Sequence, residues 1–240
     1  ATMVDADGLL KWRPHNLVIN SGDLTGTGWS GGVTAGTVTT GSPFGTYQTL
    51  SPSVSGGSLS PAQRYQIGKP ITSGVTYVGW ALVKYSAGSG WFAVNMYDTV
   101  KADEQAYFDL QNGVVGSKAT FIIDHGMIDY GDGWWLCWAS ANAASGSGGV
   151  SVEVPNGDGV QSCSFSDVIL IAGSQFNRSD LGGMVNNPDT TSSYVPTTSS
   201  AVYAPRRGHH VYNGSAWVNE GLLHESEART NLVTYSNDLS

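Results

Sequence analysis

Gly131-Asp132-Gly133-Trp134-Trp135-Leu136-Cys137-Trp138-Ala139-Ser140 is the stretch of sequence that decides the fold. It opens with a Gly-Asp-Gly turn and continues as an unbroken apolar run rich in aromatic residues, which predicts a strand that leaves a tight turn. Because side chains alternate along a strand, this one has two apolar faces. It is therefore buried between two layers, or it buries one face and offers aromatic rings to a partner on the other. The two faces consist of Trp135, Cys137 and Ala139 on one side and Trp134, Leu136 and Trp138 on the other.

The composition of the whole chain is that of an all-β protein. Its 240 residues are 40% hydrophobic and 10% aromatic but only 12% charged, and 32 of them are glycine. Short strands joined by tight turns need such a Gly-rich, weakly charged sequence, whereas helical proteins are rich in Ala, Glu, Lys and Leu. This length is enough to bury a core without covalent cross-links, and we expect little helix.

The charge balance argues against two classes of partner. The formal net charge is -8, and no basic cluster exceeds the pair Arg206-Arg207, so an acidic surface would repel a nucleic acid backbone. No apolar run approaches the roughly 20 residues of a membrane helix, so we expect no membrane insertion. The first residues, Ala1 to Asp5, do not resemble a secretory leader, and we expect synthesis in the cytoplasm.

The two cysteines, Cys137 and Cys163, are too few for a disulfide framework. Cys137 shares a strand face with Trp135 and Ala139, so we interpret it as a buried free thiol rather than a catalytic one. A bridge between the two cysteines stays open as an alternative.

A partial internal repeat indicates how the chain is organised. Gly8-Leu9-Leu10 and Asn16-Leu17-Val18 recur as Gly221-Leu222-Leu223 and Asn231-Leu232-Val233, and the likeness continues to Leu24 and Leu239. This spacing is a whole domain rather than one supersecondary unit. We therefore expect an N-terminal extension over 1–15, one domain over 16–204, and a hairpin linker with the truncated start of a second repeat over 205–240.

Short strands at regular spacing predict the architecture of that domain. Runs of alternating or continuous apolar residues are separated by turns such as Gln111-Asn112-Gly113, and an Asn-Gly turn at 213–214 predicts a further hairpin. This arrangement is typical of an antiparallel β-sandwich or jelly roll. The predicted strands cover 75–85, 91–98, 106–110, 118–123, 134–140, 150–154 and 168–171.

The order of several motifs resembles a known family. The motifs are Asn16-Leu17-Val18 with Trp29, Val83-Lys84, Tyr107-Phe108-Asp109-Leu110-Gln111-Asn112-Gly113, Gly133-Trp134-Trp135-Leu136-Cys137 and Ser193-Tyr194-Val195-Pro196-Thr197-Thr198. In this order they resemble the β-sandwich repeat of tailed-phage virion proteins, found in tail fibres, tail-associated proteins and head spikes, and similar to domains of gene transfer agents.

The resemblance implies a fold like that of carbohydrate-binding modules with jelly-roll topology, and a role in attachment to host surface polysaccharide. It also implies other virion proteins as partners, a virion location and a homo-oligomer, commonly a trimer in phage fibres. The sequence departs from the family at Leu136 and Trp138, where polar or small residues are common. Both changes make the outward strand face more apolar.

Glycan recognition needs flat rings that stack on a sugar, with polar groups around them for its hydroxyls. The strand faces place suitable side chains away from the expected core, although the sequence does not say which strands share a sheet. Packing of these rings under loops or in a subunit interface is the alternative for each one. The candidate glycan- or partner-binding residues are Trp134, Trp138, Trp80, Trp91, Asn95, Tyr97, Tyr107 and Asp109.

A polysaccharide hydrolase and a purely structural connector are the two alternatives to glycan binding. A polysaccharide-degrading hydrolase would need two facing carboxylates, and Asp98, Asp103, Glu104, Asp109 and Glu153 show no such pairing in sequence. A purely structural connector on a capsid or tail would use the rings for subunit packing. We expect a non-catalytic virion protein.

The sequence predicts no cofactor. His209-His210 is an adjacent pair without the spacing of a metal site. The acidic turns at 129–132 and 156–159 are compatible with a structural Ca²⁺ but lack the EF-hand pattern.

Overall fold

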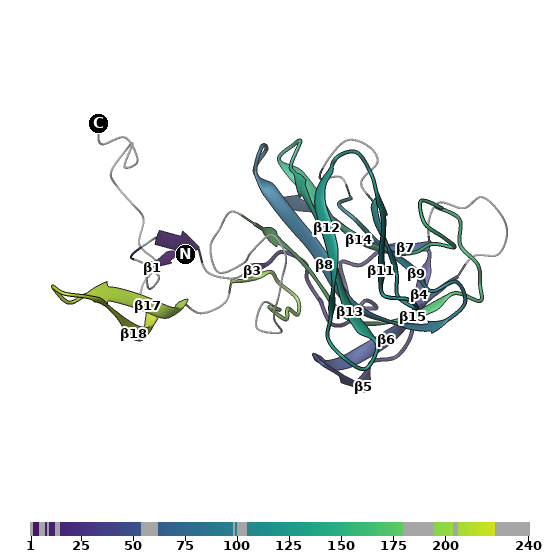
Figure 1. The fold of residues 1–240 in the computed structure, drawn as a ribbon, viewed down its shortest axis with the longest axis horizontal. Coiled ribbons are helices and arrows are strands. Elements are labelled where there is room, and N and C mark those ends of the chain that lie inside the picture. The colour runs from purple at the N-terminus through teal and green to yellow at the C-terminus, as the bar shows by residue number, and fades with distance from the viewer. Residues whose placement is uncertain are drawn as a thin grey trace. The chain divides into compact units, whose positions relative to one another are not determined.

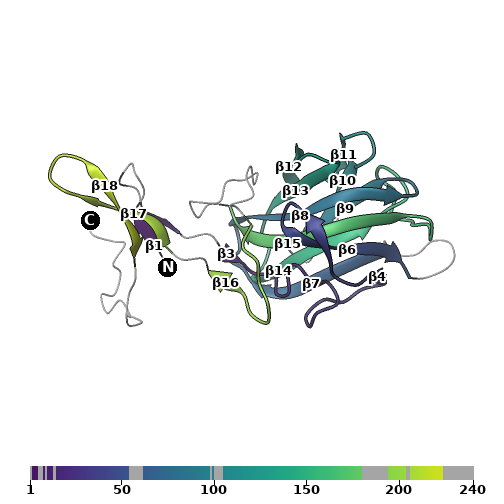
Figure 2. The same cartoon turned by 90° about the horizontal axis from the view of Figure 1, so that it is seen from below.

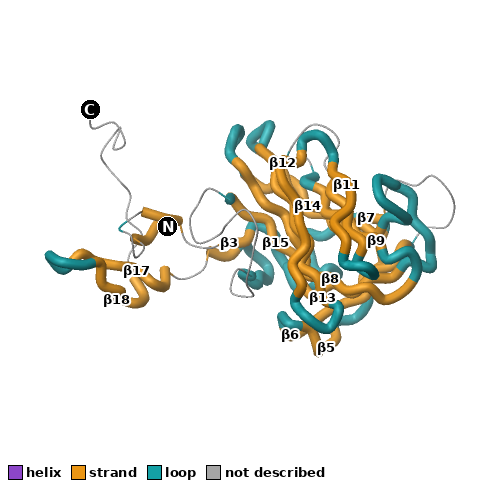
Figure 3. The backbone as a smooth tube through the Cα atoms, in the orientation of Figure 1, coloured by secondary structure: helices purple, strands orange, loops and turns teal. Residues whose placement is uncertain are grey.

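In the described residues of this computed structural model, every regular element is a β-strand (Figure 3). The all-β class predicted from composition is therefore confirmed. By its internal contacts the chain divides into two compact units, residues 12–204 and residues 1–11 with 205–240. The structure describes residues 2–4, 8, 10–12, 15–53, 62–97, 99, 105–179, 194–203 and 206–223.

The 12–204 unit contains a seven-stranded sheet, in which neighbouring strands follow the order β12-β13-β8-β15-β6-β4 and β5 pairs with β6 (Figure 1). All of these pairs are antiparallel. The strands are β4 (Val33–Ala35), β5 (Thr39–Ser42), β6 (Gly45–Pro52), β8 (Thr76–Ala87), β12 (Ile122–Asp129), β13 (Trp134–Asn142) and β15 (Val168–Arg178).

A five-stranded sheet forms the second layer, with the order β11-β10-β9-β14-β7 (Figure 2). Its pairs are antiparallel as well. The chain passes repeatedly between the two sheets, as in a jelly roll. The strands are β7 (Ala62–Pro70), β9 (Trp91–Asn95), β10 (Gln105–Asp109), β11 (Val114–Lys118) and β14 (Ser147–Val154).

The main core lies between the two sheets, where the sequence predicts it. Alternation places one face of each strand in this core, and the first part of β15, residues 168–171, is apolar on both faces as expected for a central strand. Cys137 lies in the core as a free thiol, and Cys163 is also free. The core includes Tyr77, Ala81, Val83, Phe92, Val94, Met96, Phe108, Cys137, Ala139, Val150, Val152, Ile169 and Ile171.

The first and last described segments of this unit are joined by hydrogen bonds. β3 (His15–Asn16) pairs with β16 (Val202–Tyr203). Just after β3, Ser21 accepts a hydrogen bond from the backbone N–H of Thr197 at 2.9 Å and shares one with the Tyr194 hydroxyl at 2.9 Å. The first and last motifs of the family resemblance therefore lie next to each other in the fold. Ser193, which opens the last motif, lies outside the described residues.

The other compact unit contains β1 (Thr2–Val4), β2 (Leu10–Trp12, which the contact division cuts after Lys11), β17 (Arg206–Tyr212) and β18 (Trp217–Leu223). β17 and β18 form the hairpin predicted around Asn213-Gly214, in which the backbone N–H of Asn213 donates to the carbonyl of Ala216. The second copy of the sequence repeat, from residue 231, lies outside the described residues.

One predicted strand is placed wrongly. Residues 118–123 do not form a strand, because β11 ends at Lys118 and β12 begins at Ile122, with a turn at 120–121. The Lys118 ammonium bonds to the carbonyl of Ile122 across this connection. Continuous β-propensity through Thr120-Phe121-Ile122 conceals the turn at the sequence level.

Candidate functional site

The structure separates the candidate site residues onto two opposite surfaces. Trp80, Trp134 and Trp138 lie on the face of the seven-stranded sheet that points away from the main core. The other candidates lie on strands of the five-stranded sheet, on the face that points away from the core, or just beyond that sheet. A single platform built from all of them is therefore ruled out by the topology.

The three tryptophans of the seven-stranded sheet do not form an open surface. Trp80 is completely buried, and Trp134 and Trp138 are only 4% and 5% exposed. Together with Leu136, another residue of that strand face, they belong to a second hydrophobic cluster. The expectation that these rings are available to a ligand is therefore wrong in this structure, and the alternative of packing under other parts of the chain applies.

Side chains from distant parts of the same chain cover these rings. Phe44, at the turn between β5 and β6, lies 5.9 Å from Trp80 between ring centroids and stacks on Tyr194 at 4.4 Å. Tyr47 contacts Trp134 edge to face at 5.8 Å. Since the chain covers its own rings, this cluster needs neither a glycan nor a subunit partner to be buried.

The outer face of the five-stranded sheet is different, because it mixes rings with polar side chains. The strand register places Asn95 between Ser151 of β14 and Gln105 of β10. In the next row, Ala93 lies between Glu153 and Tyr107. Gln63 of β7 extends this second row beyond Glu153. We call Gln63, Asn95, Gln105, Ser151 and Glu153 the polar floor.

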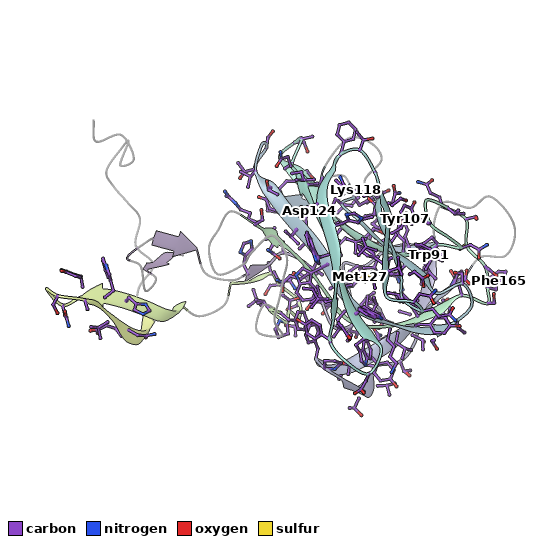
Figure 4. The ribbon with its side chains drawn as sticks, viewed as in Figure 1. Trp91, Tyr107, Lys118, Asp124, Met127 and Phe165 are labelled. Atoms are coloured by element: carbon purple, nitrogen blue, oxygen red, sulfur yellow. The ribbon has the colours of Figure 1, made fainter. Side chains whose placement is uncertain are left out.

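Aromatic rings lie at both ends of the polar floor. Trp91 is half-buried at one end, opposite Asp109 and diagonal to Tyr107 on the neighbouring strand. At the other end Tyr97 contacts Tyr65 at 5.1 Å between ring centroids. Along β9, Trp91 and Tyr97 are six residues apart, a span of about 20 Å for an extended strand. Trp91 and Tyr107 are labelled in Figure 4 with Lys118 and lie along this side of the sandwich.

A polar pocket of about 260 Å³ opens beside Tyr107. It is large enough for one small polar group such as a sugar ring, and its walls carry hydroxyl, amide and ammonium donors. The lining includes Gln105, Tyr107, Ser117, Lys118, Thr120 and Gln161.

Two predicted site residues already have structural partners. The carboxylate of Asp109 accepts hydrogen bonds from the backbone N–H groups of Gln111 and Asn112 and from the Asn112 side chain. Asp109 therefore caps the turn between β10 and β11. Asn95 donates from Nδ2 to Oε1 of Glu153 at 2.7 Å. Neither side chain is held ready for a ligand by the surrounding structure.

Glu153 is the most perturbed carboxyl group of this face. It is 1% exposed, and its burial raises its pKa to about 7, although the side chains of Asn95 and Ser151 act in the opposite direction. Its position opposite Gln63 and Ala93 fixes it in the centre of the sheet.

Sequence reasoning missed most of the polar floor. The alternation in Val150-Ser151-Val152-Glu153-Val154 could have placed Ser151 and Glu153 on the outer face. It could not reveal Gln63, Gln105 or Gln161 as neighbours, because they reach this face from separate segments.

Among the described residues, no group of three His, Cys, Asp or Glu side chains is placed to hold a metal ion. Nor does any helix long and apolar enough to span a bilayer occur in the described ranges.

The fold and site define a class of β-sandwich with one packed aromatic outer face and one that combines rings with buried polar groups. No protein-family model matches the sequence, and no curated protein matches it.

Two solved structures show weak likeness. One contains the CBM22-1 and GH10 modules of Clostridium thermocellum xylanase 10B complexed with xylohexaose, at 15% identity and a TM-score of 0.39, covering 75% of this chain and 30% of that one. The other is the enzymatically active domain of bacteriophage CBA120 tailspike protein 4, at 16% identity and a TM-score of 0.37, covering 68% of this chain and 21% of that one. The chain thus spans less than a third of either structure, and we draw no functional argument from them.

Proposed function

We propose that this chain is a virion protein of a tailed phage, from a fibre, spike or tail-associated structure, whose sandwich binds a host surface polysaccharide without cleaving it. The binding surface is the outer face of the five-stranded sheet at the half-buried Trp91 ring and the adjoining pocket, where Tyr107, only 6% exposed, supports the pocket wall from within the sheet. The homo-oligomer and the other virion partners implied by the ordered motifs belong to this proposal.

The observation that carries the proposal is the combination of ring and polar groups at one place. The Trp91 ring lies against the backbone at Gly116, where an added Cβ would come within 2.7 Å of it. Tyr107 and Gln105 line the pocket from the neighbouring strand. A sugar needs such an arrangement, with an aromatic surface for its apolar face and amides or hydroxyls for its hydroxyl groups.

The surroundings of Glu153 support binding rather than hydrolysis. A glycoside hydrolase places two carboxyl groups across the scissile bond, about 5 to 9.5 Å apart. In the described residues, the groups that act on the Glu153 carboxyl are Asn95 and Ser151 rather than a second acid. Asp109 is engaged in its turn, while Asp98, Asp103 and Glu104 lie outside the described residues.

One observation favours the alternative of a structural connector. β11 and β12 are the edge strands of the two sheets and lie close to each other. They and their connection carry exposed apolar side chains, which a subunit contact would bury. These are Val114, Val115, Phe121 and Ile123.

A glycan array probed with the full chain, followed by titration of the best ligand, tests the proposal. Trp91→Ala should weaken binding at least tenfold, equal to about 1.4 kcal/mol, because it removes the partly exposed ring of the site. Tyr107→Ala should weaken binding as well, because it removes the buried support of the pocket wall. Thermal unfolding of both variants shows whether the fold is retained.

Phe121→Ala is the matched control, since it removes an exposed ring outside the site. It should leave glycan affinity unchanged. Equal affinity of the Trp91 and Tyr107 variants and the wild type would refute the site. An array without any ligand, together with loss of self-association in Phe121→Ala, would favour the connector.

A further inference from the structure

Two buried oxygen atoms on the polar floor accept no hydrogen bond from any group in the described ranges. They are Oε2 of Glu153 and Oδ1 of Asn95, and the two residues are only 1% and 4% exposed. Nearly all buried polar atoms in native proteins have a partner, so two unsatisfied acceptors on adjacent side chains need a physical explanation.

The same two side chains are already joined by one hydrogen bond. Nδ2 of Asn95 donates to Oε1 of Glu153 at 2.7 Å. The residues lie diagonally across the β9–β14 pair, because Asn95 is opposite Ser151 and Glu153 is opposite Ala93. A diagonal placement on one sheet face brings long polar side chains together.

A carboxylic acid and a primary amide can form two parallel hydrogen bonds. In one, the amide N–H donates to one carboxyl oxygen, and in the other the acid O–H donates to the amide oxygen. The first of these bonds is present here, and the two atoms of the second are the two oxygens without donors. One proton on Oε2 of Glu153 would therefore satisfy both.

Among the described residues, no charged side chain shares the strand face of Glu153 in the neighbouring register positions. Gln63 and Ala93 lie opposite it on β7 and β9, and Tyr65 and Tyr107 are the next residues on that face. Arg64 pairs with Val152, so strand alternation directs its side chain to the other face.

Burial is the largest influence on the Glu153 carboxyl group, followed by the side chains of Asn95 and Ser151. The Ser151 hydroxyl donates to Oε1 of Gln63 at 3.1 Å, so it does not supply a donor to Oε2 of Glu153. No charged side chain is among the influences that the described residues exert on it.

We propose that Glu153 and Asn95 form a protonated acid–amide pair in the folded protein, and that release of this single proton is a pH switch that loosens the outer face of the five-stranded sheet. The switch does not depend on glycan binding. The pair lies on the same sheet face as the proposed binding surface, since Glu153 and Tyr107 are both opposite Ala93.

The direction of the pH effect follows from linkage. The pKa of Glu153 is raised from 4.5 to about 7 in the folded protein. The folded state therefore holds the proton where the unfolded chain has released it, and stability must fall as the pH rises from about 4.5 to about 7. Above this window the loss is complete, and it corresponds to a roughly 300-fold decrease in the folding equilibrium constant.

Denaturant unfolding of the full chain between pH 5 and pH 8.5 tests the pair. Glu153→Gln places an amide N–H where the acid O–H lies and cannot ionise. Relative to this variant, the folding equilibrium constant of the wild type should fall by roughly a hundredfold across the range. Asp124→Asn is the control, because it removes an exposed carboxylate that is not part of the pair, and it should keep the wild-type profile.

Infrared spectroscopy of the wild type gives a second test that does not require any variant to fold. At pH 6 the folded protein should show the carbonyl band of a buried protonated carboxylic acid, and this band should disappear as the pH is raised to 8.5. Absence of the band at pH 6, or parallel stability profiles of wild type and Glu153→Gln, would overturn the proposal.

Discussion

At the scale of single residues, Asn16 shows how one side chain can fix a fold. It is completely buried, and its amide joins two segments that lie far apart in the sequence. Nδ2 donates to the carbonyls of Ser174 and Val195, at 3.2 and 3.0 Å. Oδ1 accepts from the backbone N–H groups of Val18 and Phe176, at 3.0 and 3.2 Å. Every hydrogen-bonding position of this amide is therefore used for structure.

Asn16→Ala should consequently be strongly destabilising. The variant removes four buried hydrogen bonds, two to carbonyls and two from N–H groups, and each contributes about 0.5 to 1.5 kcal/mol. We expect a loss of about 3 kcal/mol in the free energy of unfolding, measured by urea denaturation. Asn142→Ala is the matched control, because that side chain is exposed, and it should change stability by less than about 0.5 kcal/mol. Similar values for the two variants would contradict this account.

At the scale of elements, strand alternation predicted side-chain faces well. It assigned Phe92, Val94 and Met96 to the core and Trp91 and Asn95 to the opposite face, as observed. It could do so because the direction of a side chain depends only on the local period of two. The β8 and β13 faces were assigned correctly for the same reason, including the outward direction of Trp80 and Trp138.

What alternation could not predict is the layer that covers an outward face. Trp80 is buried because Phe44 and Tyr194 pack on it from segments 36 and 114 residues away in the sequence, and no local pattern encodes these contacts. The turn-capping role of Asp109 could have been predicted from the local sequence, because Asp109-x-x-Asn112-Gly113 is a turn signal in itself. The departures from the family pattern at Leu136 and Trp138 make this face more apolar, which fits either a packed or a ligand-covered surface, and the structure shows both side chains buried.

Phe44→Ala tests the cover formed by the β5–β6 turn. Removing this ring eliminates its stacking on Tyr194 and its edge contact with Trp80. We expect a loss of about 2 kcal/mol, below the usual range for a fully buried Phe because Phe44 is only partly buried. Acrylamide should quench the tryptophan fluorescence of this variant more strongly than that of the wild type, whereas Phe121→Ala should leave the quenching unchanged. Unaltered quenching and stability in Phe44→Ala would mean that the outer cluster does not need this cover.

At the scale of the whole sandwich, the topology is dominated by contacts between distant segments. The hydrogen bonds of Asn16 join residues 158 and 179 positions apart. β14 pairs with β7, and β15 with β6, across shorter but still non-local separations, whereas β9, β10 and β11 form a local meander. Long loops must lose conformational entropy before their contacts stabilise the fold, so the local meander is the favoured place for folding to begin.

This topology predicts both a slow folding rate and a distinct kinetic effect of the Asn16 bonds. All-β domains rich in non-local pairs fold in milliseconds to seconds, and we expect stopped-flow refolding of this chain in that range.

Because the Asn16 contacts close the longest loops, they should form after the transition state. Asn16→Ala should then accelerate unfolding roughly a hundredfold and change the folding rate less than about twofold. Phe108→Leu, in the local meander and 6.4 Å from Phe92 between ring centroids, should instead slow folding. If the chevron plot instead showed that Asn16→Ala acts mainly on the folding limb, the Asn16 contacts would form before the transition state. The two ends of the sandwich would then come together early in folding, which would contradict this prediction.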